Sequence, residues 1–144
     1  MATTATLTLA SADIAGDPVS VTKTATLTKA GSTNDLDQST GLNRVHLRST
    51  TNKVLLAANA EGDNLAAKVY IINKATDASL YVTVTINAQT IGKLYAGDFM
   101  FIPWSQTDTS ASIEVAATNW TSSTGDIPVE YALFHEDTDF LTNA

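Results

Sequence analysis

Cysteine is absent from the 144 residues of the chain. The sequence therefore has no disulfide framework, no thiolate metal site and no thiol nucleophile. Basic residues are also few, with 8 Lys and Arg against 15 Asp and Glu, which gives a formal net charge of −7. This charge argues against a large phosphate-neutralising surface, and nucleic acid is not expected as a partner.

Long apolar runs are missing as well. Residues 1–12 alternate Thr with Ala or Leu and lack both the positively charged start and the continuous apolar segment of a secretory signal, so no Sec signal is predicted. No apolar run approaches the roughly 20 residues that a membrane-spanning helix needs. The sequence thus predicts no membrane partner.

Alternation of apolar and polar residues at period two recurs along the chain, which is typical of half-buried strands. About nine or ten short strands separated by turn signals predict an all-β, antiparallel β-sandwich or jelly-roll-like single domain over residues 1–144. Residues 1–12 are expected to form an N-terminal arm or edge strand, and residues 137–144 an acidic tail. A helix over residues 55–67 is the one competing interpretation, and Gly62-Asp63-Asn64 interrupts it.

The densest apolar material lies in residues 67–104. Residues 69–72 and 80–86 are rich in Val, Ile, Tyr and Thr, and the polar segment 74–79 between them predicts a β-hairpin. The aromatic strand 99–104 follows a corner at Ala96-Gly97-Asp98. We therefore expect three or four adjacent antiparallel strands here.

The first part of the chain is rich in Thr. A strand is expected at residues 4–10, and residues 19–29 predict a second strand that places Val19, Val21, Ala25 and Leu27 on one face and Ser and Thr on the other. Residues 30–42 are polar and turn-rich, which makes them the least core-like stretch of the sequence.

No constellation of residues predicts catalysis, a metal site or a cofactor. The two histidines, His46 and His135, lie far apart in sequence, whereas a zinc site takes at least three protein ligands. The acidic clusters, Asp35 with Asp37 and Glu136-Asp137 with Asp139, lack the spacing of a calcium loop. A glycosidase would need two carboxylates across a cleft, and the sequence leaves open whether Glu114 and Glu130 could serve.

Two surface features have both a structural and a functional interpretation. Arg44, His46 and Arg48 alternate with apolar residues and form a basic strip, which either blunts a sheet edge or docks an acidic partner. Trp120 lies in a loop and is a candidate exposed anchor, whereas Trp104 follows an apolar strand and is expected in the core or a subunit interface.

The segments KVYIINK, VTVTI, IGKLYAGDFMFIPW, IEV and VEYALFHE resemble small all-β virion proteins of tailed bacteriophages, particularly marine and cyanobacterial phages. The resemblance covers residues 68–136, leaves residues 1–53 uncovered, and rests on structural motifs without a catalytic residue. The residues that match the frame are Leu94, Gly97, Asp98, Phe99, Phe101, Tyr131 and Phe134.

This resemblance implies a non-enzymatic decoration or cement protein that binds and stabilises the major capsid protein shell, assembled in the host cytoplasm and located on the capsid surface. It implies docking through the basic strip and a homo-oligomer, with a trimer favoured. The expected oligomer interface comprises Val69, Ile71, Met100, Ile102 and Trp104. The alternative is a tail or fibre module that binds host glycans through Trp120 and nearby tyrosines.

Overall fold

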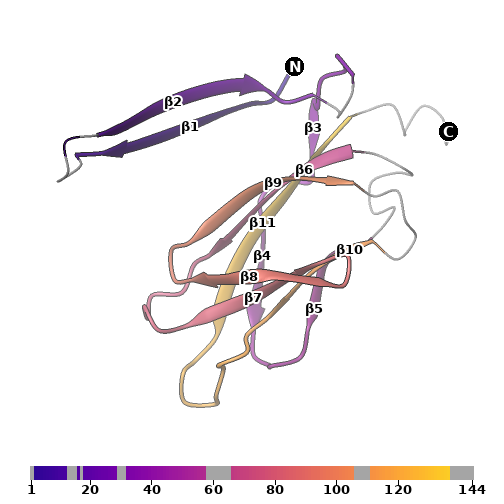
Figure 1. The fold of residues 1–144 in the computed structure, drawn as a ribbon. Helices are drawn as coiled ribbons and strands as arrows, with labels where there is room; N and C mark the ends of the chain where they lie inside the picture. The colour runs from indigo at the N-terminus through magenta and orange to yellow at the C-terminus, as the bar shows by residue number, and fades with distance from the viewer. Residues whose placement is uncertain are drawn as a thin grey trace, which may run out of the picture.

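The computed structural model describes residues 2–12, 16, 18–28, 32–57, 66–105 and 111–136. Regular structure in these residues consists of eleven β-strands, so the all-β, antiparallel prediction is confirmed. None of the described residues forms a helix that is long and apolar enough to span a membrane. The first two strands, β1 (Thr4–Ser11) and β2 (Val19–Thr26), form a hairpin that projects from the rest of the molecule (Figure 1).

The remaining nine strands form two sheets that pack as a sandwich. One sheet has four strands, in the order β5 (Lys53–Ala57), β10 (Ser112–Ala116), β7 (Tyr81–Ile86) and β8 (Gln89–Tyr95). The other has five: β3 (Gln38–Ser39) and β4 (Asn43–Leu47) both pair with β11 (Ile127–His135), which is followed by β6 (Ala66–Asn73) and β9 (Phe99–Ser105).

The strand pairing from β4 onward is nested. The first strand of this set pairs with the last, β4 with β11, and the second with the seventh, β5 with β10. The third pairs with the sixth, β6 with β9, and the two middle strands, β7 and β8, form a hairpin. The chain therefore crosses from one sheet to the other at nearly every connection.

Burial of the inward-facing side chains of both sheets creates the core. Val69, Ile71 and Val129 from the five-stranded sheet and Val84 and Val115 from the four-stranded sheet are almost completely buried in one cluster. Their neighbours along each strand point outward, as a pleated strand requires. A bulge between β5 and β10 lets two consecutive residues, Leu55 and Leu56, both be buried.

Two predictions of local structure are wrong. Residues 69–72 and 80–86 do not form a hairpin, because β6 pairs with β9 and β11 whereas β7 lies in the opposite sheet. The segment between them is a connection across the sandwich rather than a tight turn. The helix predicted for residues 55–67 is wrong at both ends, because residues 55–57 belong to β5 and residues 66–67 belong to β6. Residues 58–65 fall outside the described residues.

Candidate binding cleft at the base of the N-terminal arm

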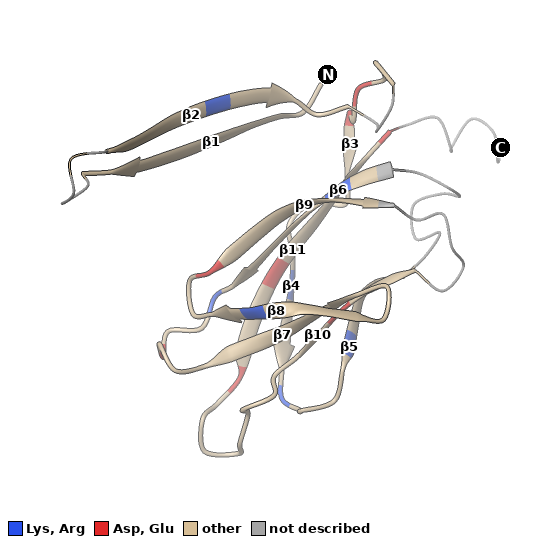
Figure 2. Cartoon of the chain, viewed as in Figure 1, with Lys and Arg blue, Asp and Glu red and all other residues tan. Residues whose placement is uncertain are grey.

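The hairpin of β1 and β2, which we call the arm, has two chemically different faces. Its register places Thr6 opposite Thr24 on one face and Leu9 opposite Val21 on the other. The second face is mainly aliphatic but also carries Lys23, opposite Leu7, and Ser11, opposite Val19. The Oγ1 atoms of Thr6 and Thr24 lie 3.0 Å apart and form a hydrogen bond. Lys23 is the only charged residue of the two strands (Figure 2). The arm is therefore an almost uncharged ribbon with one polar and one aliphatic face.

The aliphatic face of the arm is not covered by the rest of the chain. Leu7, Leu9, Val19 and Val21 are each between 43% and 49% exposed. A two-stranded ribbon is at best marginally stable alone in water, because it cannot bury enough apolar area to offset its ordering. The face expected to pack on a core is thus open to solvent along most of its length.

The base of the arm is hydrogen-bonded to the segment that leads into the sandwich. The N–H of Leu27 donates to the carbonyl of Thr3 at 2.8 Å, and the N–H of Leu36 donates to the carbonyl of Leu27 at 2.8 Å. The N–H of Thr3 in turn donates to the carbonyl of Leu36 at 3.2 Å. Leu36 is completely buried, so residues 30–42, expected to be the least core-like stretch, supply the anchor of the arm.

Aromatic side chains gather on the outer face of the five-stranded sheet. Phe99 is 58% exposed and Phe101 40%, while Tyr70 and Phe134 are half-buried. The rings of Tyr70 and Phe99 lie 6.4 Å apart, and those of Phe101 and Phe134 lie 6.3 Å apart in an edge-to-face arrangement. We call these four residues the aromatic patch. An exposed aromatic cluster of this kind marks a surface for association.

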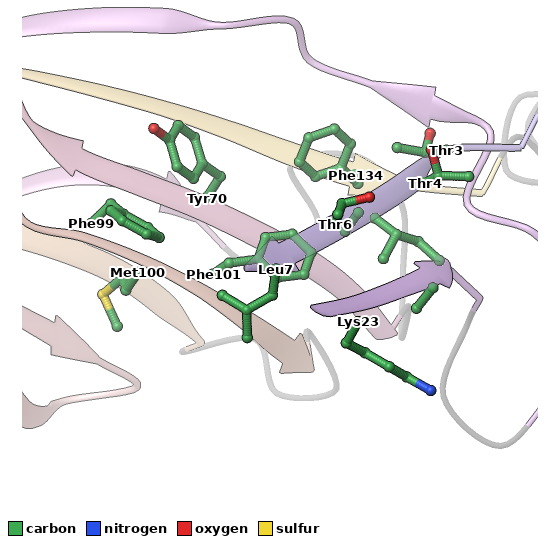
Figure 3. A pocket seen from close by; sticks show the side chains of 13 residues that line it. Thr3, Thr4, Thr6, Leu7, Lys23, Tyr70, Phe99, Met100, Phe101 and Phe134 are labelled. Atoms are coloured by element: carbon green, nitrogen blue, oxygen red, sulfur yellow. The ribbon is translucent and has the colours of Figure 1, made fainter. Parts of the chain in front are cut away.

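A cleft of about 580 Å³ separates the base of the arm from the aromatic patch. One wall is the arm, where Leu7, Ala25 and Leu27 line the cleft, and the other wall is the sheet (Figure 3). Lys23 is the charged residue among those that line it. The cleft is therefore open, mainly apolar and suited to aliphatic or aromatic groups.

The predicted oligomer interface requires correction. Val69 and Ile71 are completely buried in the domain core, Trp104 is only 3% exposed, and Met100 and Ile102 pack partly buried against the same core. Val69, Ile71, Ile102 and Trp104 point between the two sheets, whereas Met100 also lines the cleft (Figure 3). In β6 and β9 the residues of the opposite phase face outward instead, among them Tyr70, Phe99 and Phe101. Because side chains alternate along a strand, an error of one residue exchanges the buried and exposed faces.

The basic strip lies at the edge of the five-stranded sheet, and each of its members faces a carboxylate of the same chain. Arg44 forms an ion pair with Glu130. Arg48 lies 2.8 Å from Asp126, and the Nδ1 atom of His46 lies 3.9 Å from the same carboxyl group. The strip is thus internally paired, which agrees with the edge-blunting interpretation and leaves docking a prediction.

These ion pairs perturb the carboxylates. The hydrogen bond from Arg48 lowers the pKa of Asp126 below its ordinary value of 3.8, and the charges of Arg48 and His46 add to this. The hydrogen bond from Arg44 likewise lowers the pKa of Glu130 below 4.5. Both carboxylates remain ionised at neutral pH, so neither has the raised pKa of a general acid.

Trp120 is partly buried and packs against the core rather than standing free as an anchor. Its Nε1 atom is buried and has no hydrogen-bond partner among the described residues. The Nε1 of Trp104, in contrast, donates to Asn87 at 3.2 Å. A more exposed aromatic site lies on the outer face of the four-stranded sheet, where the rings of Tyr81 and Tyr95 lie 5.1 Å apart.

The candidate polar residues do not converge. His135 is buried and lies 3.1 Å from the carbonyl of Glu136, whereas His46 is exposed on β4. Glu114 and Glu130 lie on different sheets and point away from the shared core, so they do not face each other across a cleft.

Asp35 and Asp37 are exposed, Glu136 is buried, and Asp137 and Asp139 lie outside the described residues. The part of the chain that the structure describes contains no group of three potential metal ligands.

Comparison of the chain with protein-family models, with curated proteins and with solved structures finds no match. Function must therefore be inferred from the surfaces of the molecule itself. The sequence did not single out the aromatic patch, because both faces of β9 are apolar and periodicity cannot tell which one is outward. The Thr-rich face of residues 4–10 and 19–29 could have suggested a strand pair with one solvent-exposed face. The sequence contains no signal that this pair projects away from the sandwich.

Proposed function

We infer that the sandwich is a jelly roll. Nested pairing of eight strands, with the first beside the last and the fourth beside the fifth, is the arrangement expected when one long hairpin rolls into two sheets. Jelly rolls build viral capsid and lectin domains. The strand order therefore supports two function classes, and the surface features favour the first.

We propose that the chain is a non-enzymatic structural protein of a phage virion, a decoration or cement protein on the major capsid protein shell. The observation that carries the proposal is the projecting arm, whose aliphatic face and opposing aromatic patch are both uncovered in the isolated chain. Exposed apolar surfaces mark sites of association, and a two-stranded ribbon without such a contact is at best marginally stable. The resemblance of residues 68–136 to small all-β virion proteins supports the same assignment.

The mechanism would be mass action. A protein that binds the assembled shell but not its dissociated subunits stabilises the shell by its binding free energy. If the protein is itself oligomeric, each added contact raises the effective concentration of the next. No reactive centre is needed for this function, and the ion-paired carboxylates described above are consistent with a purely structural surface.

Binding to heads tests this proposal. Phage heads lacking the chain are purified, and the purified chain is added back. We expect the chain to cosediment with the heads and to raise the temperature at which the shell opens. A chain that neither cosediments with the heads nor changes that temperature overturns the proposal.

The contribution of the basic strip to docking can be separated from its internal pairing. Arg44→Glu breaks the ion pair with Glu130, whereas Arg44→Glu combined with Glu130→Arg restores a pair with the charges exchanged. If Arg44 docks on an acidic capsid surface, both variants lose head binding. If Arg44 only stabilises the sheet edge, the exchanged pair restores binding to the level of the unaltered chain.

A glycan-binding module of a tail or fibre is the second candidate. The observation in its favour is the pair Tyr81 and Tyr95 on the outer face of the four-stranded sheet, with the Nζ of Lys93 4.3 Å from the centre of the Tyr81 ring. Flat rings with an adjacent cation suit a sugar face. A glycan array with Tyr95→Ala and Trp120→Ala controls tests it, and an array without specific signal removes this candidate.

A further inference from the structure

We propose that the outer half of the arm of one copy fills the cleft of a second copy, and that the exchange is reciprocal. This proposal rests on the assembly role proposed above and names the partner of its principal surface. The outer half of the aliphatic face, Leu9, Val19 and Val21, does not line the cleft of its own chain and is exposed. The cleft, in turn, has two apolar walls and a volume of about 580 Å³.

The two surfaces are chemically complementary. Three aliphatic side chains on one flat ribbon would meet the rings of Phe99 and Phe101 and the aliphatic base of the receiving arm. The cleft is ample for these side chains. The Thr face of the entering arm, including Thr8 and Thr22, would remain toward solvent, where its hydroxyl groups need no protein partners.

The area reaches the threshold for a specific pair. Leu7, Leu9, Val19, Val21, Phe99 and Phe101 are each about half exposed and together offer on the order of 500 Å² per copy. A reciprocal exchange removes this area from both copies, about 1,000 Å² in total, which reaches the lower limit for a specific interface. A ring in which each contact holds a single arm would bury only about half as much at each contact.

Charge opposes the contact only weakly. The chain carries a formal net charge of −7, so copies repel one another in general. The arm strands contain no acidic residue, and the aromatic patch is uncharged. Lys23 lies on the same side of the arm as Val21 and lines the cleft, so it is the one charged side chain at the contact. Salt screens both the general repulsion and that between the lysines of the two copies. Association through the arm should strengthen as salt concentration rises.

Single-cysteine variants of the full chain test the contact directly, because the native chain has no cysteine. Val21→Cys on the arm is mixed with Phe101→Cys on the patch under mild oxidation. A disulfide between the two proteins requires the arm of one copy to approach the patch of another. Val54→Cys is the matched control, since Val54 is also an exposed strand valine, 48% accessible, but lies on β5 in the other sheet.

We expect the arm–patch pair to give at least about 10-fold more heterodimer than the control pair, because exchange raises the local concentration of the two thiols. Equal yields for the two pairs overturn the proposal.

Sedimentation equilibrium supplies a test that does not depend on cysteine chemistry. The unaltered chain is expected to be a dimer, and Val19→Thr with Val21→Thr is expected to weaken dimerisation by at least about 10-fold. The same change at Val54 should leave it unaltered. A monomer at all concentrations, a trimer, or equal effects of the arm and control changes overturns the proposal.

The failure of this inference is distinguishable from the failure of the proposed function. A chain that is monomeric in solution but cosediments with phage heads retains the assembly role and refutes the exchange. A chain that dimerises through the arm but does not bind heads retains the exchange and refutes the virion assignment.

Discussion

The side-chain amide of Asn73, at the end of β6, donates a hydrogen bond to the backbone carbonyl of Leu94 in β8, on the opposite sheet, at 2.9 Å. The same nitrogen lies 3.3 Å from the carbonyl of Leu80, and the side-chain oxygen accepts from the N–H of Ala75 at 2.9 Å. Asn73 is completely buried. One polar side chain thus joins the two sheets where the chain passes between them.

Asn73→Ala should lower the free energy of unfolding by about 3 kcal/mol, because three backbone groups, all buried or partly buried, lose their partner. Urea unfolding followed by fluorescence measures the change. Asn52→Ala is the control, since Asn52 is exposed and donates a single bond to Glu114. The prediction is contradicted if Asn73→Ala lowers the free energy of unfolding no more than Asn52→Ala does. In that case water molecules or shifted neighbours would satisfy the backbone groups that Asn73 binds.

A glycine substitution in the turn between β7 and β8 should stabilise the chain. Asn87 and Ala88 have φ values of 49° and 66°, the left-handed conformation that a two-residue hairpin turn requires. Alanine is strained there, and Asn-Gly is the preferred sequence. Ala88→Gly should raise the free energy of unfolding by about 0.5–1 kcal/mol.

Ala78→Gly is the matched control, because Ala78 lies in an exposed turn and has no positive φ. It should lower the free energy of unfolding slightly, through the greater freedom of the unfolded chain. The prediction for Ala88 is refuted if both glycine variants are destabilised.

The two tryptophans should respond differently to the same substitution. Trp104→Phe removes a buried hydrogen bond to Asn87 and should lower the free energy of unfolding by about 2 kcal/mol. Trp120→Phe removes a buried N–H that has no partner among the described residues and should cost less than about 1 kcal/mol. Chemical unfolding of both variants measures this, and an equal or reversed order contradicts it.

Acid should weaken the sheet edge. The pKa values of Asp126 and Glu130 are lowered in the folded chain by their arginine partners, so their ionised forms favour folding above the unfolded pKa values. This contribution is complete above about pH 5 and is lost as pH falls through the lowered folded pKa values. It should be small, because the ion pairs are accessible to solvent.

The test compares melting temperatures of the unaltered chain and an Asp126→Asn, Glu130→Gln variant as a function of pH. The advantage of the unaltered chain should be largest near neutral pH and should shrink below about pH 4. An advantage that stays constant or grows in acid would contradict the assignment of these ion pairs.

Strand positions could be predicted from the sequence, because alternation is a local property. Val82 and Val84 alternate with Thr83 and Thr85, and β7 lies where this pattern places it. Pairing partners could not be predicted, because partner choice depends on contacts far apart in sequence. Residues 69–72 pair with β9 and β11 rather than with the next strand, since the connection after Asn73 crosses the sandwich.

The sequence also could not predict which face of a strand is exposed when the residues on both faces are apolar. In β9, Phe99 and Phe101 alternate with Met100 and Ile102, and hydrophobicity alone favours neither side. In the structure, Met100 and Ile102 pair with the buried residues Ile71 and Val69 of β6, and this face of the sheet packs against the other sheet. The predicted interface on Val69 and Trp104 was therefore placed on the buried side.

The arm shows a further limit of periodicity. Val19 and Val21 alternate with polar residues just as Val82 and Val84 do, yet they are exposed. Alternation predicts that one face of a strand is apolar. It does not predict whether that face packs against the same chain or against another molecule. In this chain the missing contact is the observation from which we propose an assembly.

Electron cryomicroscopy of the virion to which we propose that this chain belongs tests the central claim most directly. The account predicts density for the two-sheet sandwich on the outer surface of the head, with each arm seated against the aromatic patch of a neighbouring copy. Particles that lack this density, or that show the arms extended into solvent with Phe99 and Phe101 uncovered, would contradict it.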